Sequence, residues 1–179
     1  MEDYSTVVAT VLRHRERDDT SYLSDVKRGI SENTKNYAWA HIAPIVDGND
    51  QELTALCRVA AIIALNPDAK QKDGQSLGQA LHKLYQRLNE GRSPNGESSG
   101  SVVNRIQTLP MLDFERAAEA IDSLIEYLAS EQIGVDFYDV AKTLLRWGNG
   151  ISEESRYIRN RIIRDFYRQH ENEGKDNLL

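Results

Sequence analysis

Apolar residues recur along this chain at intervals of three and four, and no segment alternates cleanly between apolar and polar residues. Intervals of three and four place side chains on one face of an α-helix, whereas a half-buried strand needs an interval of two. The widest apolar face belongs to the segment 51–65, which is predicted to be a central helix of the core. We therefore predict an all-α fold of about eight or nine helices.

Capping residues and prolines mark where these helices begin and end. Asp50 is expected to cap the helix 51–65, and Pro67 ends it because proline cannot continue the helical hydrogen bonds. Ser76 and Gln79 have the spacing of a capping box. Further caps are expected at Asp113, Asp136 and Ser152.

The segment Gly91–Gly100 divides the predicted helices into two groups. It is rich in Gly, Ser, Pro and Asn, a composition typical of flexible loops. We predict two small packed helical bundles, an N-terminal one over residues 1–90 and a C-terminal one over 101–170. Residues 171–179 are expected to form a polar, frayed tail.

The composition excludes several classes of protein. The net charge is −6 and the pI is about 5.3, which excludes a histone-like binder that relies on overall positive charge. The single cysteine, Cys57, excludes an intramolecular disulfide and a Cys-x-x-Cys zinc site. The longest apolar run, Val59–Leu65, has seven residues, too few to span a membrane, and the first residues do not resemble a signal peptide. We expect a cytoplasmic protein with no membrane partner.

Charge is distributed unevenly along the second half of the chain. Residues 111–139 hold eight acids and one base, whereas residues 140–170 hold seven bases and three acids. This asymmetry indicates an anionic partner for the C-terminal helices. The alternative is a solvated helix face with acid–base pairs across the fold, and the sequence leaves both open.

Several basic residues share helix faces. Lys142 and Arg146 are four residues apart, so they lie on one face of their helix. Arg161, Arg164 and Arg168 fall within an arc of about 60°, a stripe that can follow a phosphate backbone.

Two arginines lie among apolar residues and have two interpretations each. Arg58 is on the most apolar helix. It is either the buried partner of a carboxylate or a basic group that emerges beside a groove. Arg159 lies on the apolar side of the last helix. It is either a structural arginine at a helix contact or an arginine held rigidly at the edge of a groove.

No catalytic or metal site is evident in the sequence. The four histidines are scattered, and none has another histidine or cysteine at metal-ligand spacing. Cys57 lies on an apolar helix face, where a small hydrophobic role is expected. Asp136 and Asp139 are better explained by helix capping than as paired catalytic carboxylates. We expect a protein that is not an enzyme and has no cofactor.

A set of short motifs in a fixed order resembles the CasB family, the small subunits of the type I-E CRISPR surveillance complex Cascade. The resemblance extends from about Val26 to Tyr167. The motifs that carry it are Ser76-Leu77-Gly78-Gln79-Ala80-Leu81, Asn104-Arg105-Ile106-Gln107-Thr108-Leu109, Val135-Asp136-Phe137, Leu144-Leu145-Arg146-Trp147-Gly148, Arg159 and Asp165-Phe166-Tyr167.

The resemblance implies a non-catalytic subunit of two helical bundles. It further implies that two copies lie side by side in a larger ribonucleoprotein, together with the other Cascade subunits. There a basic face would hold crRNA-paired target DNA and the displaced strand of the R-loop. The contacts carried over by position are Lys27, Arg28, Arg58, Arg105, Lys142 and Arg159, and local charge adds Arg146, Arg156 and Arg161.

Two alternatives come from other classes of protein. One is a helical protein–protein adaptor whose basic face docks an acidic partner, and salt-sensitive binding to single-stranded nucleic acid would argue against it. The other is a small hydrolase, which needs a pocket with converging titratable groups.

Overall fold

The computed structural model describes residues 3–91 and 98–176, with side chains as far as Arg168. These residues form nine α-helices and two short 3₁₀-helices, which confirms the all-α prediction. Their only β-type pairing is a single parallel bridge between Gln71 and Val135. The elements are α1 (Asp3–Glu16), α2 (Thr20–Lys27), η1 (Arg28–Ile30), α3 (Lys35–Ile42), α4 (Asp50–Leu65), α5 (Leu77–Asn89), α6 (Ser99–Thr108), η2 (Leu109–Met111), α7 (Phe114–Ser130), α8 (Phe137–Leu145) and α9 (Glu153–Asp176).

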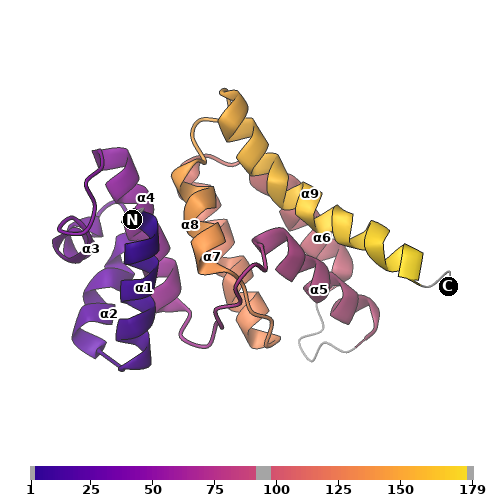
Figure 1. Ribbon diagram of the computed structural model, residues 1–179, viewed down its shortest axis with the longest axis horizontal. Helices are drawn as coiled ribbons and strands as arrows, with labels where there is room; N and C mark the ends of the chain where they lie inside the picture. Colours follow the sequence, from indigo (N-terminus) through magenta and orange to yellow (C-terminus); the bar gives the residue numbers. More distant parts are fainter. Residues whose placement is uncertain (1–2, 92–97, 177–179) are drawn as a thin grey trace.

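The helices are arranged in a row of groups along the long axis of the molecule (Figure 1). Helices α1 to α4 form one end, α5, α6 and α9 form the other, and α7 and α8 lie between them. Helix α8 packs against α1 and α4, while α5 packs mainly against α9. Segments from both sides of residues 91–100 therefore pack against each other, and the division into two bundles at that segment stays a prediction.

Helix α4 is the central helix that the sequence predicts. Eleven of its residues are buried, from Leu53 to Ala64, and it contacts α1, α2, α3, α7 and α8. Cys57 is one of these residues, and burial raises the pKa of its thiol to about 12. The thiol is therefore protonated at neutral pH, as expected for a cysteine that acts as a small hydrophobic residue.

Most of the predicted helix caps are present. Ser76 and Gln79 form the capping box of α5, and Asp113 and Asp136 each accept a backbone hydrogen bond at the start of α7 and α8. Ser152 Oγ accepts a hydrogen bond from the Ser155 backbone N–H at 3.2 Å. The prediction for α4 is wrong by one residue, because Asn49 rather than Asp50 caps it and forms a capping box with Glu52.

Two predicted irregular segments are shorter in the structure. Helix α6 already begins at Ser99, so the end of the predicted loop Gly91–Gly100 is helical, and residues 92–97 lie outside the described residues. Helix α9 continues to Asp176, into the segment expected to be a frayed tail. No proline interrupts this stretch, and the helix continues through Asn172 and Gly174 in spite of their low helix propensity. Residues 177–179 lie outside the described part.

The structure shows neither a membrane-spanning helix nor a metal site in the part of the chain that it describes. None of the described helices is both long and apolar enough to cross a bilayer. Among the same residues, no group of three or more His, Cys, Asp or Glu side chains could hold a metal ion.

The contact between α5 and α9 depends on Gly78. A Cβ atom at Gly78 would lie 2.9 Å from the Asp165 Cβ and still closer to the Ile162 carbonyl oxygen. We expect Gly78→Ala to reduce the free energy of unfolding by about 1–3 kcal/mol, because α9 must move away. The melting temperature should fall by about 2–4 °C for each kcal/mol.

Gly100→Ala is the matched control for this substitution. The atom nearest to a Cβ at Gly100 is Ser98 Oγ at 3.8 Å, an ordinary contact, and alanine favours the helix. Its melting temperature should therefore equal or slightly exceed that of the wild type. Equal melting temperatures for the two variants would contradict the close approach of α5 and α9.

Candidate nucleic-acid interface

Arg161 links helices α8 and α9. Its Nη2 donates hydrogen bonds to Asp139 Oδ1 at 2.6 Å and to Thr143 Oγ1 at 2.9 Å, both on α8. Burial raises the pKa of Asp139, and the Arg161 guanidinium acts in the opposite direction. The side chain of Arg161 is about one-fifth exposed, so it joins the helices and also faces solvent.

Further cations lie beside this link on both helices. On α8, Lys142 Nζ is 5.4 Å from the centre of the Tyr4 ring, and directly after α8, Arg146 Nε is 3.5 Å from Glu154 Oε1 on α9. Arg146 and Glu154 are both mostly exposed, so their ion pair is weak and leaves the guanidinium accessible. We define the α8–α9 strip as Lys142, Arg146, Arg161, Arg164 and Arg168.

Arg164, in the α9 part of the strip, contacts an aromatic side chain two turns earlier on the same helix. The Arg164 guanidinium lies 4.7 Å from the Tyr157 ring centre, and its Nη2 donates a hydrogen bond to the Tyr157 hydroxyl at 3.1 Å. Arg168 follows one turn later and is exposed. The positions 157, 161, 164 and 168 follow the three- and four-residue spacing of one helix face.

The other exposed candidates lie apart from this strip. Lys27 and Arg28 are exposed where α2 ends, and the Arg28 guanidinium stacks 4.1 Å from the Tyr37 ring centre. Arg105 is exposed on α6, a helix of the group at the opposite end of the molecule from α2 (Figure 1). Arg156 is exposed on α9, on a different face from the strip. The predicted set is thus distributed over several surfaces of the chain.

Arg58 is completely buried, which decides between its two interpretations. Its Nε and Nη2 donate to Glu115 Oε2 at 3.1 and 2.6 Å, and Nη2 also reaches Glu32 Oε2 at 3.4 Å. Its Nη1 donates to the Gly29 carbonyl oxygen. Arg58 is therefore the buried partner of carboxylates, and its guanidinium does not emerge beside a groove.

Arg159 is also a structural residue, with 6% of its surface exposed. Its Nε donates to the Trp147 carbonyl at 2.9 Å and its Nη2 to the Gly148 carbonyl at 2.6 Å. Its Nη1 donates to the carbonyls of Pro110 and Leu112, both at 3.0 Å. Burial lowers the pKa of Arg159. The guanidinium thus joins the loop after α8 to η2, and this corrects the expectation that it is available to a ligand.

A pocket that the sequence analysis missed carries a second group of cations. It has a volume of about 300 Å³ and lies between the segment 70–75, helix α5 and the turn 131–134. We call it the basic pocket, and its cationic lining residues are Lys70, Lys72, Lys83 and Arg87. The sequence signal was present in Lys70-Gln71-Lys72, because alternate residues of an extended segment point to the same side.

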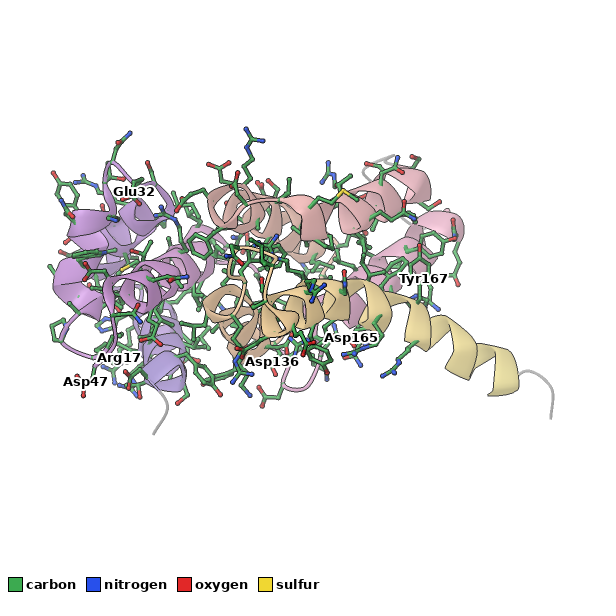
Figure 2. All side chains as sticks on the ribbon, turned by 90° about the horizontal axis from the view of Figure 1, so that it is seen from above. Arg17, Glu32, Asp47, Asp136, Asp165 and Tyr167 are labelled. Atoms are coloured by element: carbon green, nitrogen blue, oxygen red, sulfur yellow. The ribbon has the colours of Figure 1, made fainter. Side chains whose placement is uncertain are left out.

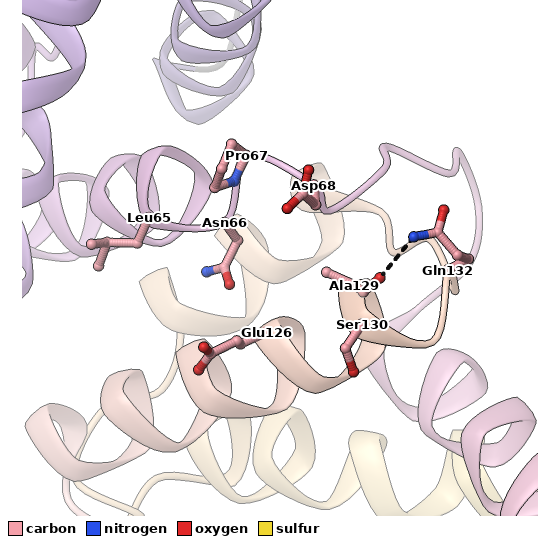
Figure 3. A pocket seen from close by; sticks show the side chains of 8 residues that line it. All are labelled: Leu65, Asn66, Pro67, Asp68, Glu126, Ala129, Ser130 and Gln132. Carbon is pink, nitrogen blue, oxygen red and sulfur yellow. Dashed lines mark hydrogen bonds between the residues drawn. The ribbon is translucent and has the colours of Figure 1, made fainter. Parts of the chain in front are cut away.

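A neighbouring pocket has the opposite charge (Figure 3). It has a volume of about 330 Å³, lies between the end of α4 and the end of α7, and is lined by Asp68 and Glu126 without any basic residue. Gln132 lines both pockets and donates to the Ala129 carbonyl at 3.4 Å. Two carboxylates without a basic residue disfavour phosphate in this pocket.

The sequence comparison identifies the family. A sequence model of the family described as CRISPR-associated protein Cse2 matches residues 22–167. The chain belongs to the Cse2 family. The matched span agrees with the region whose motifs resemble CasB, and the predicted family is confirmed. A search of the curated proteins found no match for this Cse2-family chain.

Solved structures share the fold of this Cse2-family chain. A Cse2-family protein from Thermus thermophilus is 24% identical, with a TM-score of 0.69 over 93% of this chain and 99% of that one. CasB from M. ruber is 19% identical, with a TM-score of 0.67 over 98% of each chain. A chain of a structure called "CRISPR RNA-guided surveillance complex" is 20% identical, with a TM-score of 0.74 over 98% of this chain and 97% of that one.

Proposed function

We propose that this chain is a non-catalytic, nucleic-acid-binding subunit of a Cascade-type CRISPR ribonucleoprotein. The observation that carries the proposal is the α8–α9 strip, five cations on two helices of a Cse2-family protein. The proposed partners are the other Cascade subunits, crRNA, target DNA and a second copy of the chain. The proposed location is the cytoplasm.

The chemistry of the strip suits the sugar–phosphate backbone. Arginine and lysine on rigid helices neutralise phosphates without reading bases, because contacts to phosphate carry no sequence information. In an RNA-guided complex, base pairing between guide and target reads the sequence, and protein subunits supply charge and shape. The strip would in this way stabilise crRNA-paired target DNA and the displaced strand of the R-loop.

The structure changes which predicted residues enter this proposal. Arg58 and Arg159 are left out, because both are buried and their guanidinium groups are bonded inside the protein, whereas Arg161 still faces solvent. The remaining candidates are Lys27, Arg28, Arg105, Lys142, Arg146, Arg156 and Arg161. Because the whole chain has a net charge of −6, the assembled complex is the appropriate form for a binding test.

The test removes two charges from the strip with Lys142→Gln and Arg146→Gln. Two exposed contacts of about 0.7 kcal/mol each should weaken target binding by the assembled complex about tenfold. The loss should be the same for every target sequence, and the slope of log affinity against log salt should become shallower. The measurement is target DNA affinity at several salt concentrations, together with complex assembly.

Arg13→Gln with Arg17→Gln is the matched control, because it removes the same charge from exposed positions on α1 and just after it. Figure 2 shows Arg17 far from Tyr167 on α9. A strip variant that binds DNA as tightly as this control would contradict the proposed function. If the strip variant fails to assemble while the control assembles, the chain acts instead as a protein–protein adaptor.

A further inference from the structure

The basic pocket has a lining that selects for anions. Four of its nine lining residues are cationic, and none of the nine is acidic. Four of the remaining five are polar or glycine, and Ile133 is the one apolar residue among them. Pockets for small organic molecules are mostly apolar, so this lining suits a charged, hydrophilic ligand.

Backbone pairing holds Lys70 and Lys72 side by side on one wall. The Val135 N–H donates to the Lys70 carbonyl and the Lys72 N–H to the Val135 carbonyl, both at 3.0 Å. In this extended segment Gln71 points to the other side, where its Nε2 donates to Asp136 Oδ1 at 3.0 Å. The two lysines therefore share a direction that the backbone fixes.

The absence of a side chain at Gly134 brings this wall close to the turn. A Cβ at Gly134 would lie 2.8 Å from the Lys72 Cβ and 3.0 Å from the Lys70 carbonyl oxygen. Two nearby carboxylates accept hydrogen bonds from other donors, since Asp73 accepts from Gln71 at 2.8 Å and Asp136 accepts from the Gly74 N–H at 2.9 Å. A third acid, Glu131, is buried in the turn beside the pocket. Lys70, Lys72 and Gly134 together therefore line one side of the pocket.

Helix α5 supplies the opposite wall. Lys83 and Arg87 are one turn apart and share a face, with Lys83 Nζ donating to Gln75 Oε1 and Arg87 Nη1 to the Glu131 carbonyl. Gln75 is held in turn by its bond to the Gly134 carbonyl at 2.5 Å. An ammonium has three N–H donors and a guanidinium five, so both cations keep donors beyond these bonds.

We propose that the basic pocket binds phosphate groups in the backbone of a single nucleic-acid strand, as a second contact beyond the α8–α9 strip. This inference rests on the proposed function and adds a specific site to it. The strand is favoured over a free nucleotide because the lining provides donors for phosphate and no aromatic surface for a base. The acidic pocket lies on the other side of Gln132 and is lined by carboxylates. Of these two pockets, the basic pocket is therefore the one that attracts a phosphate.

The test uses Lys70→Gln with Lys72→Gln, which leaves the backbone bonds of this segment in place. In the assembled complex we expect target DNA affinity to fall about fivefold to tenfold at the lower salt concentrations. The loss of two single-strand phosphate contacts should reduce the slope of log affinity against log salt by about 1.4. The control is again Arg13→Gln with Arg17→Gln, and Lys142→Gln with Arg146→Gln is measured beside them.

A titration of the isolated full chain with pyrophosphate identifies the site itself. Pyrophosphate should shift the backbone amide signals of Lys72 and Gly134 in NMR spectra, and Lys70→Gln with Lys72→Gln should abolish those shifts. Pyrophosphate binding without any change in DNA affinity would overturn the strand as occupant and assign the pocket to a small phosphate anion.

The remaining outcomes separate the two proposals. If the pocket variant matches the Arg13/Arg17 control and the wild-type amides do not shift, the pocket proposal is overturned, whatever the strip variant does. If the strip variant alone loses DNA affinity, the proposed function stands without the pocket. If the pocket variant alone loses it, the pocket is supported and the assignment of the strip fails.

Discussion

Arg159→Ala is expected to destabilise the protein by about 3 kcal/mol. The substitution leaves the part-buried carbonyls of Pro110 and Gly148 without the hydrogen bonds that Arg159 donates, and an acceptor left unsatisfied on burial costs about 1–3 kcal/mol. It also removes the guanidinium that lies 4.9 Å from the Trp147 ring centre. In a chain of this size the melting temperature should fall by about 6–12 °C, measured by circular dichroism.

Two further variants make this prediction specific. Arg156→Ala removes an exposed arginine one turn earlier on α9 and should change stability by less than about 0.5 kcal/mol. Arg159→Lys should be intermediate, because one ammonium cannot reproduce the fork of a guanidinium across two loops. Melting temperatures within a degree or two for Arg159→Ala and Arg156→Ala would show that the carbonyl contacts contribute little.

The same geometry affects how a binding experiment on Arg159 is interpreted. A variant such as Arg105→Ala with Arg159→Ala removes one exposed and one buried arginine. Any loss of DNA affinity would then combine a lost surface charge with a displaced start of α9, which carries the strip. Lys142 and Arg146 are better probes, because both are exposed.

Local patterns in the sequence predicted the fold well. The spacing of apolar residues and the capping box at Ser76 and Gln79 report on neighbours within a few residues, and the structure confirms both. Gly148 and Gly150 follow α8, and both have positive φ angles, at 54° and 80°, which glycine adopts more readily than other residues. A side chain at Gly150 would also approach Arg159 Nη1 to 3.1 Å, a contact between distant residues that local patterns do not contain.

The candidate site was harder to predict, because burial of an arginine depends on distant partners. Arg58 meets Glu115, which is 57 residues away in sequence, and Arg159 is bonded to carbonyl groups, which every residue carries. The apolar neighbours of Arg58 and Arg159 in the sequence indicated a structural role as one alternative, but the sequence pattern did not identify the partners that decide it. The strip was partly predictable, because the spacing of Arg161, Arg164 and Arg168 is local, whereas the link from Arg161 to Asp139 on α8 is not.

Arg58→Ala is expected to have the largest effect on stability, about 3–5 kcal/mol. Arg58 is among the largest fully buried side chains, and its truncation leaves a cavity in α4, the central helix. The substitution also removes the hydrogen bond to the Gly29 carbonyl and separates η1 from Glu115 on α7. Thermal or urea unfolding of the isolated chain measures the loss.

Most of the stability lost in Arg58→Ala should come from the cavity and from the Gly29 carbonyl that loses its donor. The two carboxylates that lose their partner should contribute less. Glu115 and Glu32 have side chains that are 48% and 59% exposed, so water can solvate both when Arg58 is absent. Arg58→Met fills most of the volume and should therefore lose less stability than Arg58→Ala.

A double-mutant cycle of Arg58→Met with Glu115→Gln isolates the ion pair. Glu115→Gln alone leaves the buried guanidinium without the charge of its closest carboxylate, so we expect a coupling energy of about 1–2 kcal/mol between the two positions. Additive effects within about 0.3 kcal/mol would show that the pair is energetically neutral. The cavity and the Gly29 carbonyl would then account for the whole effect of Arg58→Ala, since they are the parts of the site that water cannot replace.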